Sequence, residues 1–96
     1  MAVPKMPESG LGLMFIHASW CKPCQRTKPG IIEIDAECDD LTVVMIDGDE
    51  DLDTPMEVGL KTYPTLILTR DGKELARRGS GDKDEIKAWI GENLLD

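Results

Sequence analysis

The sequence predicts an α/β fold with the element order β-α-β-α-β-β-α, in which helices flank a central mixed sheet of about four strands. Two observations carry this prediction. The short apolar runs Leu11 to Ala18 and Leu41 to Asp47 lie on either side of a helix-compatible segment. Further along the chain, Asp71-Gly72 separates two more strand-like runs and is typical of a tight hairpin turn. We therefore expect the first two strands to be parallel, with a right-handed crossover, and the last two to be antiparallel.

The first part of the chain divides into a lead and a strand–helix unit. Residues 1–10 have no clear period, so we expect an N-terminal lead there and one domain over residues 11–96. The run Leu11 to Ala18 is almost continuously apolar, as in a strand buried on both faces. A helix is expected from about Lys22 to Glu37, with a kink at Pro29 because proline lacks the N–H donor.

Three further elements follow the second strand. Thr54-Pro55 is typical of an N-cap followed by proline at the first helical position, and Gly59 is expected to end that short helix. Strands are expected at Thr65 to Arg70 and at Glu74 to Arg78. The last helix is expected from Asp82 to about Leu94, beginning with a capping box between Asp82 and Glu85. Its apolar stripe consists of Ile86, Trp89, Ile90 and Leu94.

The composition restricts the class of partner and the compartment. A formal net charge of −8 argues against nucleic acid and against an anionic membrane surface, because both attract basic patches. No apolar run approaches the roughly 18–20 residues that span a bilayer, and residues 1–10 have no apolar core of a secretory signal. Three cysteines, with one close pair, do not resemble a secreted disulfide framework. We therefore expect a cytoplasmic protein.

The segment Trp20-Cys21-Lys22-Pro23-Cys24 contains the candidate reactive residues of this chain, two cysteines. Two cysteines separated by two residues can close a small disulfide ring or bind a metal. Here they follow an apolar strand and open a helix, and this arrangement in a small protein favours a thiol–disulfide redox site.

The chain resembles the thioredoxin family over about residues 11–96. The matching residues are Ala18-Ser19-Trp20-Cys21-x-Pro23-Cys24, Pro29, Leu41-Thr42-Val43 with Asp49, Tyr63-Pro64-Thr65, and Asp71-Gly72. The resemblance implies a thioredoxin-like fold whose N-terminal strand–helix unit is shortened or absent. It also implies a thiol–disulfide oxidoreductase that reduces protein disulfides by dithiol exchange through Cys21 and Cys24. No bound cofactor is needed, because the cysteines carry the chemistry.

The two cysteines are expected to have different roles. Cys21 lies where the strand ends and the helix begins, so helix N–H groups and Lys22 favour its thiolate, and we expect it to be the exposed attacking thiol. Cys24 should be more buried and should resolve the mixed disulfide. Pro23 stiffens the ring. Lys22 replaces the glycine common in the family, and it either makes the couple more oxidising or is a solvated lysine with little effect.

Two apolar residues replace a charged pair of the family. Phe15 matches a buried aspartate beneath the second cysteine, and Met45 matches a nearby lysine. Losing both charges together is physically coherent, because one buried charge without its partner is costly. His17 and Asp49 are possible tuning residues, and the two can share a hydrogen bond. The alternative for His17 is a purely structural role.

The resemblance also indicates a substrate-facing surface. Tyr63-Pro64 matches the cis-proline of the family, which faces the disulfide and lets an extended substrate pair with the Tyr63 backbone. Gly79 begins a small-residue stretch that is either substrate-facing or a plain loop, and Trp20 either forms the rim or packs on the helix. The predicted substrate-binding residues are Trp20, Lys22, Pro23, Tyr63, Pro64 and Gly79.

The family implies disulfide-containing client proteins, an electron donor such as thioredoxin reductase and, by analogy alone, ribonucleotide reductase as a client. We expect a monomer. One competing hypothesis is a structural zinc module that uses Cys21, Cys24, Cys38 and His17. The other is a redox-inert adaptor of the same shape. Cys38 is expected to be a bystander, with a regulatory thiol as its alternative.

Overall fold

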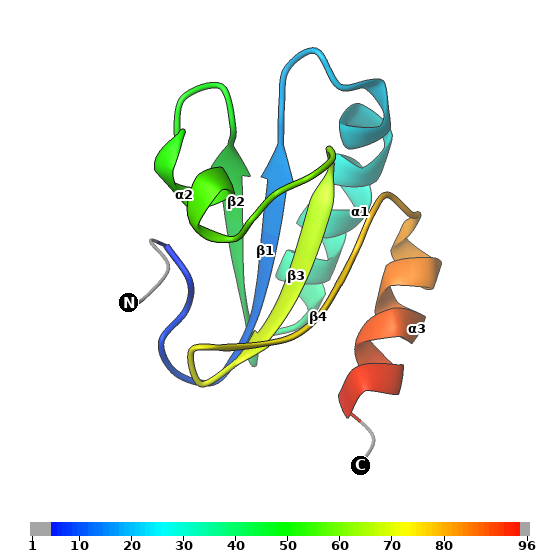
Figure 1. Cartoon of the computed structure of the whole chain (residues 1–96). Coiled ribbons are helices and arrows are strands. Elements are labelled where there is room, and N and C mark those ends of the chain that lie inside the picture. The colour runs from blue at the N-terminus through cyan, green and yellow to red at the C-terminus, as the bar shows by residue number, and fades with distance from the viewer. Residues whose placement is uncertain (1–4, 95–96) are drawn as a thin grey trace.

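A four-stranded mixed sheet with the strand order β2-β1-β3-β4 forms the centre of the molecule (Figure 1). The computed structural model describes residues 5–94. Strand β1 is parallel to β2 and antiparallel to β3, and β3 is antiparallel to β4. The elements are β1 (Leu11–His17), α1 (Lys22–Glu37), β2 (Leu41–Asp47), α2 (Asp53–Glu57), β3 (Thr65–Arg70), β4 (Lys73–Arg78) and α3 (Lys83–Leu94). The predicted α/β fold and element order are therefore confirmed, and within residues 5–94 no strand or helix precedes β1.

Strand β1 lies between β2 and β3 and is covered on both faces. Leu13 and Phe15 pack into the core under α1 and α3, whereas Met14 and Ile16 pack into the core on the opposite face, which also contains Val58. All four of these β1 side chains are fully buried. This double coverage explains why the strand is an almost continuous apolar run instead of an alternating one.

Helices α1 and α3 lie side by side on one face of the sheet (Figure 1). Gly30 permits a close approach, since a Cβ atom there would lie 3.1 Å from the backbone nitrogen of Lys83. Helix α1 continues through Pro29, and Lys83 pairs with Glu37 near its end. Ile86 is fully buried between the helices and the sheet, while Trp89 and Ile90 pack around it. Ile86, Trp89 and Ile90 of the apolar stripe predicted for the last helix therefore face the core.

Two of the predicted turns and caps are confirmed. Asp71 and Gly72 both have positive φ, 50° and 81°, as the tight turn between β3 and β4 requires. At the start of α3, the Glu85 N–H donates to the Asp82 carboxylate at 2.9 Å and the Asp82 N–H donates to the Glu85 carboxylate at 3.2 Å. This reciprocal pair is the predicted capping box.

The predicted N-cap of the short helix is wrong. Helix α2 begins at Asp53, so Thr54 lies inside it instead of capping it. The capping acceptor is Asp51, whose carboxylate accepts from the Thr54 N–H at 3.0 Å and from the Thr54 hydroxyl at 2.8 Å. A carboxylate is a stronger acceptor than a hydroxyl, which explains the shift. Gly59, with φ of 67°, follows the helix end as expected. Strand β4 begins at Lys73, one residue before the prediction.

Candidate redox site

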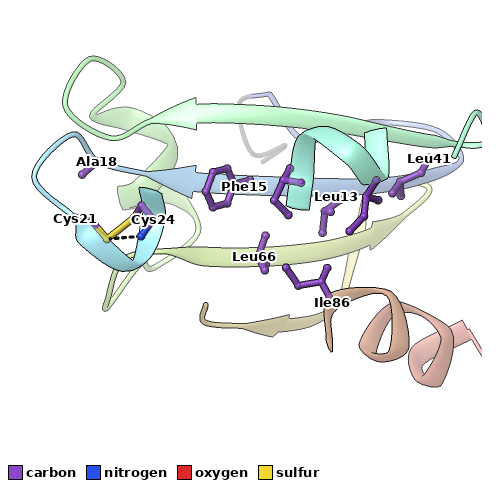
Figure 2. Packing of buried hydrophobic residues seen from close by; sticks show 10 residues of the cluster. Leu13, Phe15, Ala18, Cys21, Cys24, Leu41, Leu66 and Ile86 are labelled. Carbon is purple, nitrogen blue, oxygen red and sulfur yellow. Dashed lines mark hydrogen bonds between the residues drawn. A yellow bond between two sulfur atoms is a disulfide. The ribbon is translucent and has the colours of Figure 1, made fainter. Parts of the chain in front are cut away.

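Cys21 and Cys24 form a disulfide at the start of α1, in the loop-to-helix transition that follows β1. Their Cα atoms are 5.3 Å apart, which is within the usual range for a disulfide. Both residues belong to the apolar core under α1, at one end of the row that contains Phe15, Leu13 and Leu66 (Figure 2). The site is therefore built directly onto the core of the domain.

The two cysteines are equally buried, which corrects the expectation that Cys21 is exposed and Cys24 is not. Cys21 is 4% exposed and Cys24 is 3% exposed. The reason is that both residues belong to the core cluster under α1, so the core covers both side chains. The exposed fraction therefore does not distinguish the two cysteines. The difference between them lies in their hydrogen bonds.

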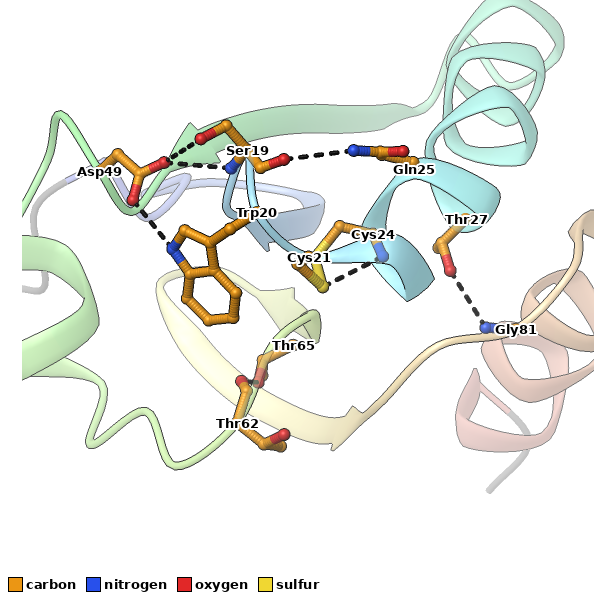
Figure 3. The surroundings of a disulfide bond; sticks show 10 residues. All are labelled: Ser19, Trp20, Cys21, Cys24, Gln25, Thr27, Asp49, Thr62, Thr65 and Gly81. Atoms are coloured by element: carbon orange, nitrogen blue, oxygen red, sulfur yellow. Dashed lines mark hydrogen bonds between the residues drawn. A yellow bond between two sulfur atoms is a disulfide. The ribbon is translucent and has the colours of Figure 1, made fainter.

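The backbone of α1 favours negative charge on Cys21. As the N-cap residue, Cys21 accepts a hydrogen bond at its Sγ from the backbone N–H of Cys24, with a distance of 3.2 Å (Figure 3). The first N–H groups of a helix lack partners inside the helix and carry partial positive charge. Pro23 within the first turn has no N–H to compete. A thiolate formed at Cys21 would therefore meet a preorganised donor.

Phe15 lies under the disulfide and is fully buried in the same core cluster as Cys21 and Cys24. Met45 is its Cα partner across the β1–β2 pairing and packs against the cluster. The prediction that Phe15 is buried behind the cysteines is thus confirmed. The paired positions Phe15 on β1 and Met45 on β2 are both apolar. This pair therefore gives Cys24 no ionisable neighbour.

Asp49 fixes the loop that leads into the cysteines (Figure 3). Its carboxylate accepts from the Ser19 N–H at 3.0 Å, from the Ser19 hydroxyl at 2.7 Å and from the Trp20 indole N–H at 3.2 Å. These donors, led by the Ser19 hydroxyl, lower the pKa of Asp49 below its usual value. The suggested hydrogen bond between His17 and Asp49 is not among the bonds of the described residues, because Asp49 is turned toward Ser19 and Trp20.

Trp20 stands at the rim of the site. It is 66% exposed, and its ring meets the Tyr63 ring edge to face at a centroid distance of 5.2 Å. The exposed ring agrees with a place on the rim, and the role of Trp20 in binding a substrate stays a prediction. Lys22 is exposed beside it, and Pro23 is partly exposed.

The loop before β3 carries the other predicted substrate residues. The Tyr63–Pro64 peptide bond is cis, as predicted, and Pro64 is buried. Gly79 is exposed and borders a pocket of about 480 Å³ together with Lys61, Thr62, Thr65, Arg77 and Arg78. The segment that follows Gly79 is tied to α1 by the Gly81 N–H, which donates to the Thr27 hydroxyl at 3.4 Å (Figure 3).

His17 lies at the end of β1, behind the cysteines. Its ring stacks on Phe15 at a centroid distance of 5.2 Å and an interplanar angle of 22°, and the residue is partly buried. Burial and the nearby Lys28 cation lower the pKa of His17, while Asp47 and Asp49 oppose that shift. The imidazole is therefore biased toward its neutral form.

Cys38 lies far from the redox pair. It caps the C-terminal end of α1, whereas Cys21 caps the N-terminal end, and 16 helical residues separate them. At about 1.5 Å per residue the helix is roughly 24 Å long, so the four ligands of the zinc hypothesis do not meet. Over residues 5–94, the structure contains no group of three or more His, Cys, Asp or Glu residues arranged to hold a metal ion.

Sequence reasoning assigned no role in the site to four polar residues that lie there: Ser19, Thr27, Lys28 and Asp47. Lys28 follows Cys24 by four residues, so helical spacing alone places both on one face of α1. Ser19 and Asp47 flank the strand ends, where parallel strands bring their carboxyl-terminal residues together. The contact between Thr27 and Gly81 spans 54 residues and has no local signal.

Protonating Asp49 should release Trp20. A carboxylate with a lowered pKa keeps its contacts above the usual value of 3.8 and loses them as the pH falls through its lower folded value. We expect Trp20 fluorescence, measured in a Trp89→Phe background, to change with a midpoint below 3.8. Asp49→Asn should remove this transition, and Asp39→Asn, at an exposed position before β2, should leave it. An unchanged transition in Asp49→Asn would refute the assignment.

Comparison with known proteins gives one consistent result. The family model described as Thioredoxin matches residues 5–92 of this chain. Thioredoxin of Bacillus subtilis (strain 168) is 38% identical over 87 residues, which cover 88% of this chain and 84% of that protein. Thioredoxin of Chlamydia muridarum (strain MoPn / Nigg) is 36% identical over 86 residues, with the same shares of the two chains.

A solved structure agrees at the level of the fold. The X-ray structure of Fasciola hepatica thioredoxin has a TM-score of 0.82 and 21% sequence identity, and the match covers 90% of this chain and 83% of that one. Within residues 5–94 we find no helix with the length and apolar character needed to cross a membrane.

Proposed function

The chain belongs to the thioredoxin family and is a thiol–disulfide oxidoreductase with a redox-active Cys21–Cys24 pair, and from this we propose that Cys21 attacks client disulfides and Cys24 resolves them. The family implies disulfide-containing substrates and a thioredoxin reductase as electron donor. The assignment of the two roles rests on the geometry of the two sulfurs.

The reaction consists of two exchanges. The Cys21 thiolate attacks one sulfur of a client disulfide, forming a mixed disulfide and releasing the other client sulfur as a thiolate. Cys24 then loses its proton and attacks Cys21 Sγ, which closes the Cys21–Cys24 disulfide and releases the second client thiolate. Two electrons pass from the two cysteines to the client, whose thiolates take up protons. No bound cofactor enters this balance.

The strongest support for Cys21 as the attacking thiol is one hydrogen bond. The Cys24 N–H donates to Cys21 Sγ at the N-cap of α1, whereas Cys24 lies within the first turn. A thiolate is the reactive form of cysteine, and a helix N-terminus lowers its pKa. The donor is already in place, so the start of the helix favours the thiolate at Cys21.

We place the client-binding surface around the disulfide. Trp20, with its exposed ring, and Tyr63, with which it is in edge contact, form one side. An extended client segment would pair with the backbone beside Pro64. The pocket beside Gly79 would receive a client side chain, and its lining includes three cations, Lys61, Arg77 and Arg78. Lys22 and Pro23 complete this surface at the start of α1.

The proposal also covers the cellular compartment, the oligomeric state and the partners of the protein. We place the protein in the cytoplasm as a monomer, with ribonucleotide reductase as one client class. The acidic net charge of −8 supports the absence of nucleic acid and anionic membranes among its partners. The lead of residues 1–10 and the domain of residues 11–96 remain the proposed division of the chain.

Limited alkylation tests which thiol attacks. The experiment uses the reduced Cys38→Ser variant, so that the redox pair supplies the only thiols. With limiting iodoacetamide at neutral pH, we expect the label on Cys21, because its thiolate is stabilised by the helix N-terminus. Peptide mass mapping identifies the labelled residue. Label found mainly on Cys24 would overturn the assignment.

A further inference from the structure

A pocket of about 320 Å³ lies behind the redox pair, at the end of β1 and along α1. It is bordered by His17, Cys24, Lys28 and Asp47, and also by Ala18, Ser19 and Gln25. The volume exceeds the roughly 30 Å³ that one water occupies, so water can bridge polar groups across it. The pocket thus joins the one histidine of the chain to the second cysteine.

The second exchange requires a proton acceptor for Cys24. Cys24 is 3% exposed and lies in an apolar core, so burial disfavours its thiolate. The N–H of Cys24 is directed at Cys21 and does not stabilise Cys24 itself. The residue beneath, Phe15, offers no basic atom. The proton must therefore leave on the side where the pocket lies.

We propose that His17 is the proton acceptor for Cys24 in the second exchange, with water in this pocket carrying the proton between them. This inference rests on the proposed function, since it concerns the step in which Cys24 resolves the mixed disulfide. The stacking of the imidazole on Phe15 holds it beside the pocket. The Cys24 thiol gives its proton to His17, the thiolate attacks Cys21 Sγ, and the departing client thiolate is protonated by His17 or by solvent.

The charges around His17 suit this role. Burial and Lys28 from α1 lower the pKa of His17 and so favour the neutral imidazole, which can accept a proton. Asp47 at the end of β2 and Asp49 in the next loop favour the imidazolium that forms after the transfer. These are the charged groups that face His17 from α1, β2 and the following loop.

Asp47 borders the same pocket but is a less suitable acceptor. Its carboxylate already accepts from the Asp49 N–H at 2.9 Å in the turn after β2. It is also the Cα partner of His17 across the β1–β2 pairing, where it can stabilise the imidazolium. Histidine is the side chain whose ordinary pKa lies nearest to neutral pH, so it matches the proton transfer better.

The test separates the two exchanges with the chromogenic disulfide DTNB. One equivalent is mixed with the reduced Cys38→Ser variant, which leaves only the redox pair. The first nitrothiobenzoate released reports attack by Cys21, and the second reports resolution by Cys24. Absence of the first release refutes the proposed function. A change confined to the second release leaves the proposed function intact and concerns only the proton acceptor for Cys24.

His17→Gln keeps a polar side chain that does not titrate. We expect the second release to slow about 10²-fold at neutral pH, as for loss of a general base, and to lose its pH inflection. In the parent that inflection should lie below 6.5, with the rate falling as the pH falls, because protonated His17 accepts no proton. An unchanged rate and inflection in His17→Gln would overturn the inference. Loss of the inflection in Asp47→Asn, with its retention in His17→Gln, would also overturn it.

Lys28→Gln provides a test that does not disturb the strand or the cysteines. Lys28 is exposed and lowers the pKa of His17, so its removal should move the inflection of the second release to higher pH. Arg26→Gln, an exposed cation on the opposite side of the same helix, should leave the inflection in place. No upward movement in Lys28→Gln would contradict the role of His17.

Nuclear magnetic resonance gives a readout independent of turnover. A single histidine yields one set of ring signals, so its titration midpoint can be measured directly in the reduced protein. We expect this midpoint to coincide with the kinetic inflection in the parent and to move with it in Lys28→Gln. A kinetic inflection that differs from the histidine midpoint would assign the proton transfer to another group and overturn the inference.

Discussion

Replacing Phe15 with aspartate should destabilise the fold by more than the roughly 3–5 kcal/mol expected for losing a buried aromatic ring alone, because it also buries an unpaired carboxylate. Phe15 is fully buried beneath the cysteines and stacks on His17. Typical domains have only about 5–15 kcal/mol of stability, so the loss is a large fraction of the total. Urea unfolding of the oxidised protein measures it.

Phe15→Ala is the matched control, because it removes the ring without adding charge. The difference in stability between Phe15→Asp and Phe15→Ala should shrink as the pH falls, since burial raises the pKa of the new carboxyl group and protonation removes its charge. A double-mutant cycle adds Met45→Lys, at the Cα partner of Phe15. Phe15→Asp with Met45→Lys should regain part of the loss. Parental stability in Phe15→Asp alone would contradict the burial of this position.

Replacing Cys24 with serine should abolish multiple turnover in insulin-disulfide reduction and trap clients on Cys21. The physical reason is that the first exchange still forms a mixed disulfide, but no internal thiol remains to release the product. The trapped species should appear as a larger band on a non-reducing gel and disappear on reduction. Continued turnover at the parental rate would contradict the resolving role of Cys24.

Cys38→Ser is the matched control for this experiment. Cys38 is a partly exposed free thiol at the far end of α1, so its loss should leave turnover close to that of the parent. The combination of Cys24→Ser with Cys38→Ser should trap the same mixed disulfides. Loss of turnover in Cys38→Ser alone would refute the bystander interpretation.

The sequence predicted most of the fold because its local signals agree with one another. The apolar run of β1 reflects burial on both faces, and Asp71-Gly72 supplies the two positive φ angles of the hairpin. The capping box of Asp82 and Glu85 was visible because both partners lie within one helical turn. The prediction at Thr54 was wrong because Asp51, earlier in the same loop, can also cap the helix, and only the folded loop shows that it does so.

The redox site was predictable in part. The cysteine motif and the cis bond before Pro64 followed from the resemblance to a family. The hydrogen-bond partners of Asp49 did not follow, since its contacts with Ser19 and Trp20 depend on how the loops after β1 and β2 meet. The near-equal burial of the two cysteines was also hidden, because spacing along the chain says nothing about how much of each side chain the folded loop covers.

The two outer strands of the sheet, β2 and β4, differ in how well their side chains prevent pairing with another copy of the chain. β4 bears Lys73, Glu74, Arg77 and Arg78, and such charged side chains discourage edge-to-edge pairing with another copy. β2, with the sequence LTVVMID, has no lysine, arginine or proline along its length. The net charge of −8 therefore keeps copies of this strand apart by long-range repulsion. That repulsion weakens in acidic or concentrated salt solutions, where we expect aggregation to begin at β2.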